Sequence, residues 1–152
     1  MAWIKRHCRL LQVLIGVTWL LAASAQAEKL YVVVNAAVEV ESLSHSEVLN
    51  IFMGRSQKLD RQQIALPLDI SSDHPEKAEF YQALIHRDLA EVNSYWTRVM
   101  FSGDASPPRQ MDTYEQIRQV IRNNLGAIAY LPESELKQLP EASYRVVHVL
   151  GE

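Results

Sequence analysis

Cysteine is almost absent from the chain. The sequence has one, Cys8, and it lies ahead of an apolar run that we expect to be removed with the N-terminus. The domain that remains after this removal holds no thiol. This excludes disulfide bonds, thiolate metal sites and cysteine nucleophiles, while an oxidising compartment stays compatible with the composition.

Clustered positive charge is also lacking. The sequence has 15 Lys and Arg against 18 Asp and Glu, and three of the basic residues fall within residues 1–27. The remaining 12 basic and 18 acidic residues give residues 28–152 a net charge of about −6. Because nucleic acids are bound by clustered basic residues, we expect no nucleic-acid partner.

The familiar catalytic and cofactor motifs are missing as well. The sequence contains no Gly-x-Ser-x-Gly elbow, no Gly-x-x-x-x-Gly-Lys phosphate loop and no dinucleotide fingerprint. The histidines after residue 27 lack the i, i+4 pairing of zinc proteases; they are His45, His74, His86 and His148. We therefore expect no enzyme activity, no metal site and no cofactor.

The first 27 residues have the pattern of a secretory signal peptide. Three basic residues precede the apolar run LLQVLIGVTWLLAA, which is too short to span a bilayer comfortably. Ala25 and Ala27 then supply the small residues that a signal peptidase requires. We predict a signal peptide over residues 1–27, cleaved before Glu28, and a periplasmic or secreted protein. The alternative is an uncleaved N-terminal anchor.

Residues 28–152 have the length of one domain in which strands alternate with helices. Runs rich in β-branched and aromatic residues predict strands over residues 29–35, 62–69, 127–132 and 144–150. Capping boxes predict four helix starts, at Ser44 with Glu47, Asp73 with Glu76, Asp88 with Glu91, and Asp112 with Glu115. The segment 101–111 holds Gly103, Pro107 and Pro108 and is predicted to be a loop. This order indicates an α/β domain with one central sheet.

The stretch SSDHPEKAEFYQAL, residues 71–84, is the best candidate for a ligand site. A helix N-terminus presents free amides and a positive dipole end, so it can bind an anion. Ser71, Ser72 and His74 are the donors that this stretch offers. The alternative is that Ser72 and Asp73 only cap the helix, in which case Asp73 occupies the amides itself. Arg98 and Arg109, which flank the predicted loop, are further candidates for attracting an anion, with ordinary solvated arginines as the alternative.

Six segments resemble, in order, the phosphate ABC transporter substrate-binding protein family; they are VVVN, SLSHSEVLNIFMGR, IALPLD, FYQALI, SYWTRVMFSGDASPPR and NNLGAIAYL. The resemblance runs from about residue 29 to residue 131. It implies a periplasmic binding protein-like α/β lobe, with a central mixed sheet flanked by helices. In full-length relatives this lobe is one of two that close over phosphate, which is delivered to a membrane permease. The expected partners are therefore phosphate or another small anion and an inner-membrane permease or other envelope protein.

The sequence departs from that family in two ways. It has the length of only one lobe, and its loop at 69–76 lacks the arginine and the Gly-Ser-Gly-Thr-like run of the phosphate binders. Asp69 and Asp73 lie there instead, and carboxylates repel a phosphate dianion unless a proton is shared. The first hypothesis is an exported, non-catalytic solute-binding-type protein. The alternative is a ligand-free envelope interaction module with the same fold.

Overall fold

Buried apolar strands form the centre of the molecule. The computed structural model describes residues 28–151, so the signal peptide expected over residues 1–27 lies outside the described part. β4 (Ala127–Pro132) is buried at every position, and β1 (Leu30–Asn35) at every position but Tyr31. These two strands pair in the middle of a five-stranded sheet with the order β3-β2-β4-β1-β5. Such continuous burial on both faces requires a layer of helices on each side.

The sheet is mixed. β2 (Leu66–Ile70) runs parallel to both β4 and β3 (Arg109–Met111), whereas β1 runs antiparallel to β4 and to β5 (Tyr144–Leu150). The carboxyl ends of β2, β3 and β4 therefore meet at one edge of the sheet, which we call the carboxyl edge. The prediction of a central mixed sheet in an α/β lobe is confirmed.

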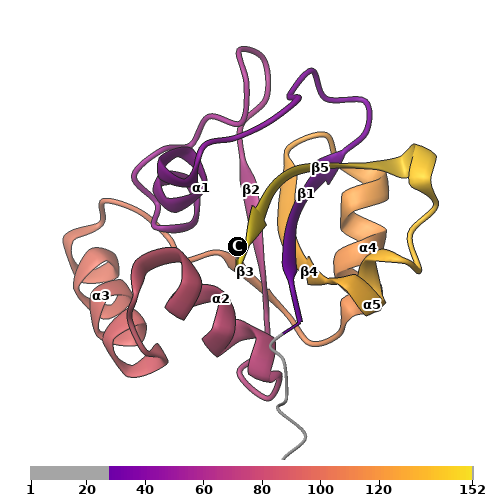
Figure 1. Cartoon of the computed structure of the whole chain (residues 1–152). Coiled ribbons are helices and arrows are strands. Elements are labelled where there is room, and N and C mark those ends of the chain that lie inside the picture. Colours follow the sequence, from indigo (N-terminus) through magenta and orange to yellow (C-terminus); the bar gives the residue numbers. More distant parts are fainter. Residues whose placement is uncertain (1–27, 152) are drawn as a thin grey trace, which may run out of the picture.

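Helices cover both faces of the sheet (Figure 1). α1 (His45–Phe52), α2 (Pro75–Ile85) and α3 (Leu89–Ser102) lie on one side, with α3 packed outside α2. α4 (Tyr114–Asn123) and α5 (Glu133–Leu136) lie on the other, and a short 3₁₀ turn, Glu141–Ser143, leads into β5. None of the helices within residues 28–151 is long and apolar enough to cross a membrane.

Aromatic packing holds α2 and α1 on the sheet. The rings of Phe80 from α2 and Tyr130 from β4 are stacked with their centroids 3.8 Å apart. Phe52 from α1 meets Phe80 edge-on at 4.8 Å. All three side chains are fully buried, and an aromatic pair of this kind adds about 1 kcal/mol beyond the burial of its apolar area. The orientation of α2 is thus fixed by its inward face.

Two of the four predicted capping boxes are confirmed. The Ser44 side chain accepts a hydrogen bond from the Glu47 amide, and the Glu47 side chain accepts one from the Ser44 amide. Asp88 and Glu91 form the same reciprocal pair at the start of α3. In both cases the local sequence was sufficient to place the helix start.

The other two predicted capping boxes are wrong, and both helices begin one residue later than predicted. α2 has His74, not Asp73, as its N-cap and makes no side-chain cap hydrogen bond. Proline favours the first helical position because its φ is already helical, so Pro75 sets the start. α4 is capped by Thr113 with Gln116 instead of Asp112 with Glu115. There β3 continues through Met111, whose carbonyl accepts a hydrogen bond from the Ser71 amide, and this moves the helix start one residue on.

The predicted loop over residues 101–111 is wrong at both ends. α3 continues to Ser102 and ends at Gly103, whose φ of 76° a residue with a side chain rarely adopts. Residues Arg109–Met111 form the edge strand β3, paired with Leu68–Ile70. A three-residue strand of this kind depends on its neighbour in the sheet and has little local signal. The predicted strand over 62–69 is likewise shifted, since β2 covers Leu66–Ile70.

Candidate functional site

Two helices begin side by side at the carboxyl edge. β2 and β3 end at Ile70 and Met111, and α2 and α4 start within a few residues of them. The rings of His74, the N-cap of α2, and Tyr114, the first residue of α4, meet edge-on with centroids 5.1 Å apart. The positive ends of two helix dipoles therefore converge at this edge, which is the position where open α/β sheets bind ligands.

The three predicted donors lie together in the turn between β2 and α2. Ser71 is buried and its carbonyl accepts a hydrogen bond from the His74 amide over 3.1 Å. Ser72 is exposed and His74 is half-buried. Because no side chain caps α2, the alternative in which Ser72 and Asp73 cap this helix is wrong. Whether Ser71, Ser72 and His74 contact a ligand stays a prediction.

The Glu76–Tyr114 pair was missed by the sequence analysis. Tyr114 is only 8 % exposed, yet its hydroxyl has no hydrogen-bond partner within residues 28–151. Oε2 of Glu76, in the first turn of α2, likewise makes no well-formed hydrogen bond, and it lies 4.0 Å from Nδ1 of His74. Burial raises the pKa of Tyr114 well above its usual value, and the charge of Glu76 and the close approach of its carboxylate to the Tyr114 hydroxyl raise it further. Glu76 and Tyr114 lie on different helices, and no local pattern in the sequence indicates that they meet.

Leaving such groups without partners is unusual. Most buried polar atoms in proteins are hydrogen-bonded, and an unsatisfied one costs about 1–3 kcal/mol. Here one side chain offers a hydroxyl donor and the other a carboxylate acceptor, both at the converging helix starts. A molecule bound at the carboxyl edge that carries both an acceptor and a donor would satisfy them together.

Two buried cations near the carboxyl edge are already paired. The Lys77 ammonium lies 3.2 Å from Oδ2 of Asp69. Arg118 on α4 binds Oε2 of Glu115 at 2.8 Å and also binds Glu135 from α5. Since neither is available to an incoming anion, the helix amides, the hydroxyl of Tyr114 and the turn residues would have to bind it.

Asp69 is at the centre of a separate, fully paired group that we call the Asp69 cluster. Its carboxylate accepts hydrogen bonds from the hydroxyls of Tyr81, at 2.9 Å, and Tyr130, in addition to the Lys77 contact. Burial, followed by the charge of Asp69, raises the pKa values of both tyrosines well above normal. The negative charge of Asp69 is therefore neutralised by its own neighbours and does not face the site.

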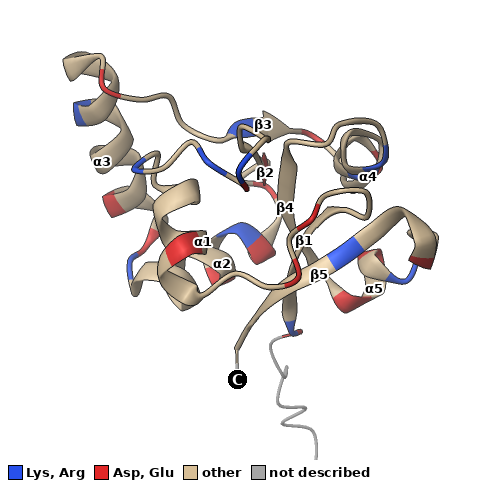
Figure 2. Ribbon diagram, turned by 90° about the horizontal axis from the view of Figure 1, so that it is seen from above, with Lys and Arg blue, Asp and Glu red and all other residues tan. Residues whose placement is uncertain are grey.

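Charge is otherwise mixed over the molecule. Figure 2 shows Lys and Arg interspersed with Asp and Glu along the described ribbon, with no long basic stripe. Over residues 28–151 no group of three or more His, Cys, Asp or Glu side chains could hold a metal ion. At the carboxyl edge, the two converging helix starts and the Glu76–Tyr114 pair are the features that a ligand could use.

Comparison with known proteins identifies the fold. Neither a family model nor a curated protein matches the sequence. Among solved structures, the chain is similar to an ABC-type phosphate transport receptor from Vibrio cholerae, with a TM-score of 0.61 and 12% identity over 80% of this chain and 46% of that one. It is also similar to a putative phosphate ABC transporter substrate-binding protein with bound phosphate from Clostridium perfringens, with a TM-score of 0.60 and 11% identity over 79% of this chain and 44% of that one.

A third similar structure is a possible phosphate binding protein from Planctomyces limnophilus, with a TM-score of 0.55 and 13% identity over 79% of this chain and 40% of that one. The chain thus spans less than half of each structure that it matches. At such low identity the likeness shows the fold and not the ligand. The chain has the fold of a single periplasmic binding protein-like α/β lobe.

Proposed function

We propose that this chain is an exported, non-catalytic solute-binding-type protein that holds a small protonated oxyanion at its carboxyl edge, with hydrogen phosphate as the first candidate. Residues 1–27 would direct export and be removed near Ala27. The observation that carries the proposal is the buried Glu76–Tyr114 pair, in which neither Oε2 nor the hydroxyl makes a well-formed hydrogen bond, beside the start of α2, which no side chain caps. The fold shared with phosphate transport receptors supports the choice of the first ligand to test.

The chemistry of the pair restricts the ligand. An oxyanion can accept a hydrogen bond from the Tyr114 hydroxyl and from amides at the helix starts. The Glu76 carboxylate repels an anion unless that anion carries a proton and donates it in a hydrogen bond. Hydrogen phosphate has such a proton at neutral pH, whereas sulfate does not. The site would therefore discriminate between two anions of the same shape.

A single lobe leaves this site open on one side. Enclosed binding by hinge closure needs a second lobe, which residues 28–151 do not supply. We therefore propose weak affinity for the free protein, in the millimolar range. An inner-membrane permease or another envelope protein would be the partner that completes the site.

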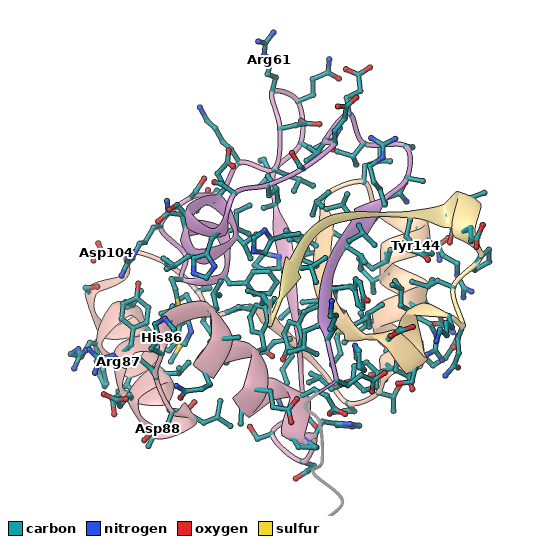
Figure 3. The ribbon with its side chains drawn as sticks, in the orientation of Figure 1. Arg61, His86, Arg87, Asp88, Asp104 and Tyr144 are labelled. Carbon is teal, nitrogen blue, oxygen red and sulfur yellow. The ribbon has the colours of Figure 1, made fainter. Side chains whose placement is uncertain are left out.

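Calorimetric or NMR titration with phosphate and sulfate tests the proposal. We expect saturable binding of phosphate near neutral pH and no binding of sulfate. Tyr114→Phe removes the hydroxyl donor and should weaken phosphate binding about tenfold. Tyr144→Phe is the matched control and should leave binding unchanged, because Tyr144 (labelled in Figure 3) pairs with Asn35 at the end of the sheet opposite to the carboxyl edge. The proposal would be contradicted if sulfate binds as tightly as phosphate, or if the Tyr114→Phe variant binds phosphate as tightly as the unmodified protein.

A second candidate function is a ligand-free envelope interaction module. It is favoured by Phe101, which is 90% exposed, and its neighbour Met100, which is 53% exposed, at the end of α3. Large apolar side chains so exposed often mark a protein contact. Failure of both oxyanions to bind in the titration above would favour this alternative.

A further inference from the structure

A cavity lies away from the carboxyl edge, between α1, α3 and the turn that joins α2 to α3. Its volume is about 770 Å³, within the range of small-molecule sites. Figure 3 shows His86, Arg87 and Asp88 on that turn. We call this cavity the arginine groove; its lining includes Leu49, Met53, Arg55, Leu84, Tyr95 and Arg98.

Two arginines in the groove have no partner. Arg55 and Arg98 are exposed, and neither forms an ion pair or side-chain hydrogen bond with any residue of the described segment 28–151. The carboxylates nearby are already engaged. Glu91 binds Nη1 of Arg87 at 2.6 Å, and Asp88 accepts a hydrogen bond from the Glu91 amide as the cap of α3. The groove therefore presents two free guanidinium groups on a protein whose overall charge is negative.

The floor of the groove is apolar and already in place. Leu49, Ile85 and Tyr95 line it and are half-buried, so part of each side chain is open to a ligand. Met53, Leu84 and Val92 also belong to the lining and are each at most 3 % exposed. The Tyr95 hydroxyl donates a 2.7 Å hydrogen bond to the Met53 carbonyl, which ties α3 to the end of α1. A ligand would not have to open the two helices before it entered.

His86 at the rim has a strained backbone. Its φ of 55° and ψ of 41° place it in the left-handed region, the only such non-glycine residue in the part of the chain that the structure describes. Glycine is the usual residue where a helix ends in this conformation. Keeping an imidazole at such a position costs about 1 kcal/mol, and strain of this kind concentrates at functional sites.

We propose that the arginine groove binds an organic carboxylate with an apolar body. The planar guanidinium groups of Arg55 and Arg98 match the geometry of a carboxylate, and the apolar floor matches a hydrocarbon chain or ring. Inorganic anions have no apolar part to bury there, and cations are repelled by the arginines. The site shares no residue with the Glu76–Tyr114 pair, so it stands whether or not phosphate binds at the carboxyl edge.

Titration of the protein with octanoate, followed by amide NMR shifts and calorimetry, tests this site. We expect shifts concentrated in α1, in the α2–α3 turn and in α3. Arg55→Gln and Arg98→Gln should each weaken binding about tenfold, because each removes a charge-assisted hydrogen bond. Arg61→Gln changes an exposed arginine at the tip of a distant loop (Figure 3) and should have no effect.

A neutral ligand provides the second control. Octanamide has the same hydrocarbon chain without the charge, so it should bind more weakly and its binding should not respond to either substitution. Tyr114→Phe should leave octanoate binding unchanged. The proposal is overturned if the Arg55→Gln/Arg98→Gln double variant binds octanoate as well as the unmodified protein, or if octanamide binds as tightly as octanoate.

Discussion

Two tyrosine–carboxylate groups lie at the start of α2, and they differ in one respect. In the Asp69 cluster, each partner is satisfied, because Asp69 accepts from two tyrosines and faces the Lys77 ammonium. In the Glu76–Tyr114 pair, the buried carboxylate oxygen and the hydroxyl lie near each other, but neither makes a well-formed hydrogen bond. The same chemical groups are thus fully hydrogen-bonded in the Asp69 cluster and not in the Glu76–Tyr114 pair.

The helix geometry explains how neighbouring residues reach such different surroundings. Successive residues of an α-helix point about 100° apart around its axis. Lys77 is buried against Asp69, whereas Glu76, one position earlier, lies near Tyr114 of α4. One turn of α2 therefore contributes to the interior and to the carboxyl edge at once. Substitutions in the two groups should separate stability from binding.

The largest effect is expected from Asp69→Asn. This substitution leaves the Lys77 ammonium buried without a counter-charge, and breaking a buried pair in this way typically costs about 3–5 kcal/mol. We expect a loss of about 3 kcal/mol in the free energy of unfolding, measured by urea denaturation. Glu76→Gln is the matched change in the open pair and should alter stability by less than about 1 kcal/mol.

A double variant checks the cause of that loss. Asp69→Asn combined with Lys77→Met removes both charges, so it should recover part of the lost stability. If the double variant is as unstable as the sum of the two single variants, the Asp69–Lys77 contact is not the source of the effect.

The sequence predicted the fold class correctly, and it marked a candidate site that stays a prediction. Alternating strands and capped helices indicated an α/β domain, and Ser44 and Asp88 placed two helix starts because a capping box is complete within four residues. The same rule failed at Asp73, where Pro75 competed with it. The turn 71–74 was identified as a candidate, but the group that gives it chemical interest, Glu76 with Tyr114, joins two helices through tertiary packing.

The arginine groove was also predicted only in part from the sequence. Arg98 was a candidate for attracting an anion from its position near the end of α3, whereas Arg55 was not. The two arginines line one cavity only because Tyr95 fixes α3 against the end of α1. A contact between side chains on separate helices leaves no spacing pattern in the sequence, so it could not have been predicted without the fold.

The next largest effect is a difference in stability between a tyrosine of the Asp69 cluster and Tyr114. Tyr130→Phe deletes a hydrogen bond to a charged, buried carboxylate and should reduce the free energy of unfolding by about 1.5–3 kcal/mol. Tyr114→Phe deletes a hydroxyl that makes no well-formed hydrogen bond, so stability should stay within about 0.5 kcal/mol or increase. Thermal and urea denaturation of both variants measures this difference. A loss at Tyr114 equal to that at Tyr130 would show that the Glu76–Tyr114 pair is closed by a hydrogen bond in solution.

The smallest effect is a difference in pH dependence. The folded-state pKa of Tyr114 is raised by burial and by the charge of Glu76, so the unfolded chain ionises first, near pH 10. The stability that this tyrosine contributes is present below about pH 10 and is lost as the pH rises further. Tyr114→Phe removes that dependence, and the variant should lose about 1 kcal/mol less than the unmodified protein between about pH 10 and 11. Below about pH 9 the stability difference between the two proteins should not change with pH, because Tyr114 is then neutral in both the folded and the unfolded state. Parallel curves up to pH 11 would mean that Tyr114 ionises as readily in the folded protein as in the unfolded chain, and that its hydroxyl is open to water at the carboxyl edge.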